Sequence, residues 1–266
     1  MSGCRLAAAV DNSCRPRGRH LLEDTLVEED IHPEYASAAL THAGKVRATN
    51  QDAFVDRHDV RLWAVADGMG GHMQGDVASR MACDGLADLV PGATLEATID
   101  DVQRRMSHVN ARLYAAAIRP INPVQSGSTL VTFLVRRTAC AVLWAGDSRL
   151  YRLRHGQLVQ LTTDHTYAAQ IAPLLAPEDR STEEDHSIMR AVGGEAALHL
   201  DVRRDRVRLG DRYPLCSDGL TREVPDEQLA VALADGNVDQ AAQALLNAAL
   251  AAGARDNVTV VVIEAA

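Results

Sequence analysis

The sequence predicts an α+β fold in which strands and helices form separate layers. Short apolar runs recur along the chain, and segments with helical spacing come in pairs before and after them. The chain has 266 residues, of which 47% are hydrophobic, so it can bury a sizeable core. Because helices and strands do not alternate one by one, we expect layers rather than a parallel βαβ sheet.

The expected strands are apolar stretches bounded by turn residues. The first covers residues 61–66 and stops at Asp67-Gly68, a dipeptide typical of turns. Further strands are expected at 129–136, 139–145, 149–154, 157–161, 202–209, 212–216 and 258–263. His155-Gly156 would close a hairpin, and Pro214 suits an edge strand or a bulge because proline donates no ladder hydrogen bond.

Helices are expected at 76–89, with Asp76 as N-cap, and at 95–118, before Pro120. Two Ala-rich helices are expected at 229–234 and 238–252. The polar segment 164–194 has no strand period and is interpreted as a partly helical flap. Residues 1–34 lack sustained periodicity, which predicts a loose N-terminal extension before one domain at 35–266.

Composition narrows the class of protein. The net charge is −9, from 27 basic and 36 acidic residues, which disfavours nucleic acid and anionic lipid as partners. Aromatic residues make up only 3%, so we expect a core of Ala, Val and Leu. No stretch has the length and apolarity of a membrane helix. Five cysteines without a C-x-x-C pair favour a reducing compartment, and Cys83, Cys140 and Cys216 fit core thiols. These features predict a cytoplasmic protein.

Four aspartates lie where an apolar strand starts or stops: Asp67, Asp147, Asp218 and Asp256. Taken singly, each is more typical of a turn, since Asp beside Gly or Asn forms turns readily. If the four converge, however, their charges repel and need a counter-ion. Oxygen ligands without a His or Cys cluster favour Mg²⁺ or Mn²⁺.

Six short motifs then occur in an order that resembles the metal-dependent protein phosphatases of the protein phosphatase 2C family, in its bacterial serine/threonine branch. They are Arg47-Ala48-Thr49-Asn50-Gln51-Asp52, Val65-Ala66-Asp67-Gly68-Met69-Gly70-Gly71-His72, Ser126-Gly127-Ser128-Thr129, Ala145-Gly146-Asp147-Ser148-Arg149, Leu215-Cys216-Ser217-Asp218-Gly219-Leu220 and Arg255-Asp256-Asn257. The resemblance covers about residues 36 to 264. It implies a four-layer α-β-β-α sandwich of two antiparallel sheets flanked by helices.

The resemblance also implies a metal centre with two Mn²⁺ or Mg²⁺ ions. Asp67 would bridge the ions, the carbonyl of Gly68 would ligate one of them, and Asp218 and Asp256 would complete the coordination of the first ion. Asp52 would hold a metal-bound water, and Asp147 with Asp218 would form a third, weaker metal site.

The implied reaction is hydrolysis of phosphoserine and phosphothreonine by direct attack of a metal-bridging water, without a covalent phosphoenzyme. Arg47 would clamp the phosphate through its planar guanidinium. His72 is the candidate proton donor to the leaving oxygen, or else a residue that hydrogen-bonds the glycine-rich turn. His165 could reach the substrate from the flap or serve only its loop, and Met69 is expected to pack.

Three readings remain open at this point. The first is a monomeric phosphatase that acts on phosphorylated proteins and opposes a bacterial serine/threonine kinase, including one of a secretion system. The second is a catalytically silent module that senses phosphoproteins; such modules usually lose metal ligands, and this chain retains Asp67, Asp218 and Asp256. The third is a phosphatase dedicated to one regulatory partner.

Overall fold

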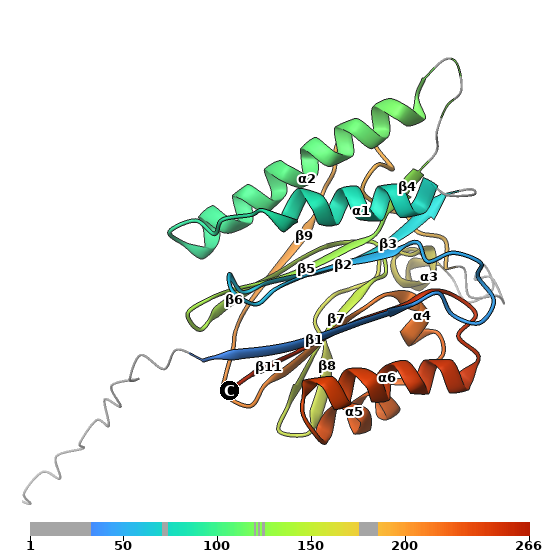
Figure 1. The fold of residues 1–266 in the computed structure, drawn as a ribbon. Coiled ribbons are helices and arrows are strands. Elements are labelled where there is room, and N and C mark those ends of the chain that lie inside the picture. Colours follow the sequence, from blue (N-terminus) through green and yellow to red (C-terminus); the bar gives the residue numbers. More distant parts are fainter. Residues whose placement is uncertain (1–32, 71–73, 120, 122, 124–125, 176–185) are drawn as a thin grey trace, which may run out of the picture. The chain divides into compact units, whose positions relative to one another are not determined.

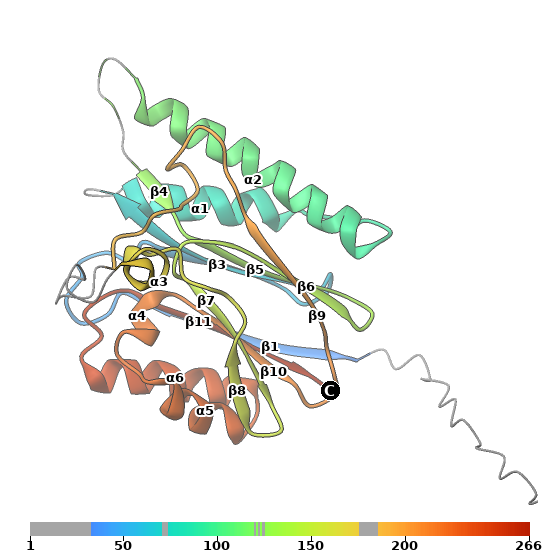
Figure 2. The same ribbon diagram turned by 180° about the vertical axis from the view of Figure 1, so that it is seen from behind.

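The structure is a computed structural model and describes residues 33–70, 74–119, 121, 123, 126–175 and 186–266. Two antiparallel sheets lie face to face between two helical layers, as both views show (Figure 1, Figure 2). The expected α+β sandwich is therefore confirmed. Most of the expected extension, residues 1–32, lies outside the described residues.

The five-stranded sheet has the order β1-β11-β10-β7-β8, and the other sheet has the order β2-β3-β5-β6-β9, with β4 paired to β3. The first comprises β1 (Tyr35–His42), β7 (Arg149–Arg154), β8 (Gln157–Gln160), β10 (Arg212–Cys216) and β11 (Val258–Ala265). The second comprises β2 (Asp52–Arg57), β3 (Leu62–Gly70), β4 (Ser126–Ser128), β5 (Leu130–Arg136), β6 (Ala139–Ala145) and β9 (Asp201–Arg206).

The helices form the outer layers and short connections. Helices α1 (Gln74–Ala87) and α2 (Leu95–Ala117) pack on the six-stranded sheet, while α5 (Asp226–Ala234) and α6 (Val238–Ala252) pack on the five-stranded sheet. Short helical turns are α3 (Tyr167–Gln170), the 3₁₀ turn η1 (Ala172–Leu174) and α4 (Asp218–Thr221). Among the described residues, no helix is long and apolar enough to cross a membrane.

The central strands are apolar on both faces because each face meets a different layer. In β3, Leu62 and Ala64 face the helices, whereas Trp63 and Val65 face the other sheet. The layer between the sheets stacks Trp63 on Phe133 and Phe133 on Tyr213, with ring centroids 5.9 and 4.6 Å apart. The few aromatic residues are thus concentrated in one layer, and Ala, Val and Leu dominate the two outer ones.

Several sequence predictions need correction. Strand β3 continues through Asp67-Gly68, because residues 68–70 pair with β4, so this dipeptide is not a turn. Helix α1 already includes Gln74, which places Asp76 in its first turn rather than at the N-cap. Pro214 lies in the interior strand β10, where it pairs with Val262. The pairing of β10 with β7 skips Pro214, so its missing N–H breaks no ladder there.

Candidate active site

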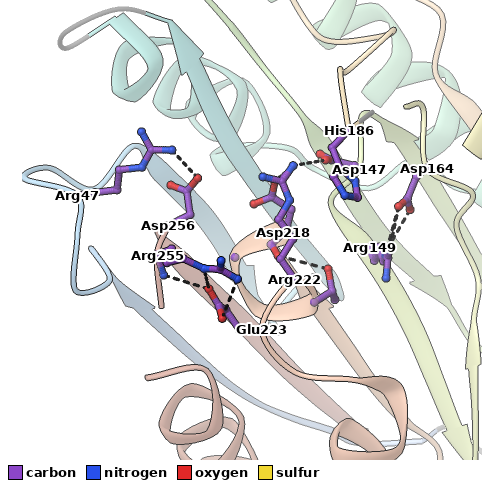
Figure 3. Close-up of a pocket in the computed structure, with 12 residues that line it drawn as sticks. Arg47, Asp147, Arg149, Asp164, His186, Asp218, Arg222, Glu223, Arg255 and Asp256 are labelled. Atoms are coloured by element: carbon purple, nitrogen blue, oxygen red, sulfur yellow. Dashed lines mark hydrogen bonds and ion pairs between the residues drawn. The ribbon is translucent and has the colours of Figure 1, made fainter. Parts of the chain in front are cut away.

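Five aspartates come from strands of the two sheets or from the turns beside them. Asp52 begins β2 and stands opposite Asp67 of β3 in the antiparallel register. Asp147 lies between β6 and β7, Asp218 begins α4 just after β10, and Asp256 precedes β11 by two residues. Figure 3 shows Asp147, Asp218 and Asp256 directed toward one cleft. The fold therefore gathers the carboxylates that the sequence had placed only one by one.

The cleft has a volume of about 580 Å³ and a lining in which charged side chains predominate. Its basic side chains are Arg47, Arg149, Arg222 and Arg255, and its acidic ones are Asp147, Asp164, Asp218, Glu223 and Asp256. Such a lining can bind cations and anions in the same space, as a phosphate held by metal ions requires.

Asp147 and Asp218 line the cleft, and Asp52 and Asp67 lie close enough that their charges act on the same group. Asp52, Asp147 and Asp218 are only 9%, 4% and 7% exposed. Burial, followed by the neighbouring charges, raises the pKa of Asp52 to about 7 and the pKa of Asp147 to about 7. The pKa of Asp67 is raised well above its ordinary value by burial and by the charges of Asp52, Asp218 and other carboxylates. A divalent cation bound to these carboxylates would offset both the cost of burying their charges and the repulsion between them.

Three of these carboxylates also have a buried oxygen without a hydrogen-bond partner. The atoms are Oδ1 of Asp52, Oδ1 of Asp147 and Oδ1 of Asp218. A buried carboxylate oxygen is expensive to leave unpaired, and such atoms normally find a donor or an ion. An all-oxygen donor set of this kind fits Mn²⁺ or Mg²⁺.

Two arginines pair with the same carboxylates. Arg47 Nη2 lies 2.7 Å from Asp256 Oδ2, and Arg222 Nη2 lies 2.6 Å from Asp218 Oδ2 and 3.4 Å from Asp147 Oδ2. Within the described residues, no three acidic, His or Cys side chains already surround one point as a preformed metal cluster. The carboxylates that could bind metal ions are thus paired with the guanidinium groups of Arg47 and Arg222.

Hydroxyl groups fix the orientation of the aspartates. Ser217 Oγ donates to Asp52 Oδ2 at 2.8 Å and accepts from Thr259 N–H at 3.0 Å. The N–H of Asp67 donates to Thr129 Oγ1 at 2.9 Å. Ser128 Oγ donates to the carbonyl of Asp67 at 3.0 Å. The bonds of Ser217 join β2 and β11 to the turn after β10, and the bonds of Thr129 and Ser128 fix the backbone of β3 at Asp67.

Asn257 holds the loop that carries Arg47. Its Oδ1 accepts from Gln51 N–H at 2.8 Å, and its Nδ2 donates to the carbonyls of Ala43 and Thr49, each at 2.9 Å. Asn257 is 5% exposed, so these bonds are shielded from water. One side chain therefore sets the path of the backbone on both sides of Arg47, which is itself exposed.

Gly68 lies where β3 passes very close to the start of α1. A Cβ at Gly68 would lie 2.0 Å from the carbonyl oxygen of Gly75, and one at Gly75 would lie 2.6 Å from the carbonyl oxygen of Gly68. Both positions therefore require glycine, and the backbone of Gly68 is held firmly beside Asp67.

Two histidines, His72 and His165, were considered from the sequence as groups that could act on the substrate. His72 lies outside the described residues. His165 is fully buried, accepts from Gly146 N–H through Nδ1 at 3.1 Å and pairs through Nε2 with Asp201 at 3.2 Å. Its burial and these partners make it a structural link beneath the Asp147 loop, not a group that reaches substrate. Met69 lies partly buried on β3.

Sequence reasoning gave no role to Arg222, Asn257 or Ser217, which the structure places against the aspartates. Asn257 and Ser217 each stand next to a candidate ligand in a quoted motif, and this adjacency was an available signal. Arg222 stands four residues after Asp218, the spacing of a helical ion pair, but a helix of four residues has too little pattern to predict.

Comparison with known proteins agrees with this arrangement. A family model described as protein phosphatase 2C matches residues 41–253. The serine/threonine protein phosphatase PstP of Mycobacterium tuberculosis is 38% identical over 233 residues, which cover 85% of this chain and 44% of that protein. The chain thus spans less than half the length of this relative.

Solved structures show the same similarity. PppA, described as a key regulatory component of T6SS in Pseudomonas aeruginosa, matches with a TM-score of 0.80 and 36% identity, over 87% of this chain and 98% of that one. The catalytic domain of PstP in complex with two manganese ions matches with a TM-score of 0.76 and 37% identity, over 86% of this chain and 97% of that one.

Proposed function

Because the chain belongs to the protein phosphatase 2C family, we propose that it is a metal-dependent phosphatase that hydrolyses phosphoserine and phosphothreonine in proteins. The observation that carries the proposal is a group of five aspartates whose charges act on one another, of which Asp147, Asp218 and Asp256 line one charged cleft. Three of the five have a buried oxygen without a hydrogen-bond partner. Their number and chemistry fit divalent ions, and the manganese complex of PstP supports that choice of metal.

Asp67, the carbonyl of Gly68, Asp218 and Asp256 would hold the metal centre, with Asp67 in the bridging position. Asp52 would contribute its free oxygen to the same centre, opposite Asp67 in the register. Asp147 stands beside Asp218 at the position that the family resemblance associates with a third ion. When bound, the ions would supply Lewis acidity that activates water and stabilises charge on the phosphate.

The protein's own groups would bind and orient the substrate. Arg47 is exposed at the rim of the cleft, and its guanidinium can turn from Asp256 to two oxygens of a phosphate. Asn257 holds the Arg47 loop, which limits the reorganisation needed on binding. His72 is proposed to donate a proton to the serine or threonine oxygen as it leaves.

We further propose the cellular setting. The enzyme is a cytoplasmic monomer that opposes a serine/threonine kinase by acting on that kinase and its substrates. The similarity to PstP, named a serine/threonine protein phosphatase, supports phosphoproteins as substrates. Residues 35–266 would form the catalytic domain with a flap at about 164–194, and residues 1–34 its extension, although the backbone of Glu34 already pairs with Ala266.

The test is hydrolysis of a phosphoserine or phosphothreonine peptide by the full chain. Phosphate release should require Mn²⁺ or Mg²⁺, stop with a chelator and return when the ion is added back. A silent binding module would instead bind the peptide without releasing phosphate. Unchanged turnover in chelator would refute the proposed mechanism.

A further inference from the structure

The guanidinium of Arg222 occupies the space between two carboxylates that the family resemblance assigns to a third metal ion. Its Nη2 atom is 2.6 Å from Asp218 Oδ2 and 3.4 Å from Asp147 Oδ2. The side chains of Asp218 and Asp147 are 10% and 5% exposed, against 39% for Arg222, so water screens the two carboxylates poorly. The pair of contacts draws together the loop after β6 and the turn after β10.

The backbone of Arg222 is firmly placed. Its N–H donates to the carbonyl of Asp218 at 2.8 Å, which closes the single turn of α4. Leu220 and Val224, on either side in the chain, are each 1% exposed and belong to the core beneath α6. The next residue, Glu223, pairs with Arg255 at 2.9 Å. The side chain of Arg222 thus starts from a fixed point beside the two aspartates.

A guanidinium and a divalent ion cannot share this position. A metal ion bound to both carboxylates needs their oxygens at about 2.0 to 2.6 Å, within the space that the Nη2 group fills. The charges also repel at such short range. In addition, two divalent ions and the guanidinium of Arg222 would together balance the five negative charges of Asp52, Asp67, Asp147, Asp218 and Asp256.

We infer that Arg222 is a built-in cation that takes the place of a third metal ion, so that this protein binds two divalent ions where Asp147 and Asp218 would otherwise recruit another. This inference rests on the proposed function, because it assumes that the remaining aspartates bind two ions. It makes Arg222 a positioning residue that holds the Asp147 loop to α4 without coordinating metal.

The test counts bound Mn²⁺ on the full chain by equilibrium dialysis with metal analysis, up to millimolar free Mn²⁺. The wild-type chain should bind two ions, and Arg222→Ala should bind one more. Arg222→Gln, which keeps most of the side-chain volume without the charge, serves as a second variant and should also bind three. Arg255→Ala is the matched control, since Arg255 lines the same cleft but pairs with Glu223, and it should bind two.

Three ions on the wild-type chain, or two on the wild type and on both Arg222 variants, would overturn the role of Arg222 and leave the two-ion centre intact. A wild-type chain that binds no Mn²⁺ would overturn the proposed metal-dependent function as well. The count of ions needs no turnover, so it separates the two failures.

Discussion

Asp52 and Asp67 face each other across the β2–β3 ladder, where two carboxylates repel unless a cation lies between them. Asp52 is buried and accepts a hydrogen bond from Ser217 on Oδ2, while its Oδ1 has no partner. The protein therefore carries, at this pair, a destabilising arrangement that a bound metal ion would relieve. This is the usual trade of stability against function at a site.

The pH dependence of stability follows from that arrangement. The pKa of Asp52 is raised to about 7 in the folded protein, so the folded state holds a proton that the unfolded state has released. The stability linked to this proton is complete below pH 4 and is lost as the pH rises through about 7. In chelator, Asp52→Asn should therefore be more stable than the wild type at pH 8, with the advantage shrinking toward pH 5. Thermal unfolding of both proteins across this pH range measures the difference, and parallel curves would contradict it.

Asn257 should matter for substrate binding. Replacing it with Ala leaves Gln51 N–H and two carbonyls without partners, at a cost of about 1 to 3 kcal/mol, and frees the Arg47 loop. We expect a higher KM for a phosphopeptide and a lower melting temperature. Asn247→Ala, which removes an exposed amide on α6, is the control and should change neither. An unchanged KM for Asn257→Ala would argue against its positioning role.

At this scale the sequence predicted chemistry better than geometry. Aspartates next to apolar strands can be recognised in a single sequence. The order of the motifs then predicted which of these aspartates belong to one metal centre. Arg222 and His165 could not be assigned, because their roles depend on contacts with residues distant in the chain or on a single helical turn. Burial decided the case of His165, whose position within the flap had left two roles open.

At the scale of elements, a buried ion pair fixes the turn before β10 to β7. Arg154 donates to both oxygens of Asp211 at 2.7 Å, and the hydroxyl of Tyr213 donates to Oδ2 at 2.8 Å. Asp211 is 1% exposed, and these partners, working against burial, lower its pKa. This pair lies just before β10, whereas Asp218 lies just after the same strand.

Asp211→Ala should strip Arg154 of its partner and destabilise the protein by about 3 to 5 kcal/mol. The exposed pair of Asp59 with Arg57 offers a comparison, because Asp59→Ala removes an ion pair that water screens and should therefore cost much less. Chemical denaturation of the two variants measures both values. Equal losses of unfolding free energy in the two variants would contradict the claim that the buried Asp211–Arg154 pair matters more for stability than the exposed Asp59–Arg57 pair.

The expected strands and helices were found wherever an apolar run or a long helical period was strong. Helix 238–252 and strands 139–145, 149–154 and 212–216 match the observed bounds. The prediction failed where tertiary contacts override local signals. The β3 strand runs through Asp67-Gly68 because β4 supplies a partner, and Pro214 is tolerated because β7 does not pair with it. Strands β1 and β2 were not identified individually, since their residues alternate in burial without a strong apolar run.

At the scale of the whole molecule, the site exists only because two sheets meet. Asp52 and Asp67 lie in strands of one sheet, and Asp218 and Asp256 flank strands of the other. Asp147 lies in the loop from β6 to β7, which connects the two sheets. The stacked aromatic layer of Trp63, Phe133 and Tyr213 holds these sheets face to face. No local sequence pattern shows that these two sheets pack together. The sequence alone therefore predicted that the aspartates come together only through a family resemblance.

The most direct test of the account is Mn²⁺ binding and phosphopeptide turnover measured together in Asp67→Ala. We predict that the variant folds with cooperative thermal unfolding, loses Mn²⁺ affinity, and turns over a phosphothreonine peptide at least about a hundredfold more slowly than the wild type. Loss of both properties in a folded protein would place the reaction at the aspartate cleft. Wild-type turnover by Asp67→Ala, or full Mn²⁺ binding without the Asp67 carboxylate, would contradict the central claim.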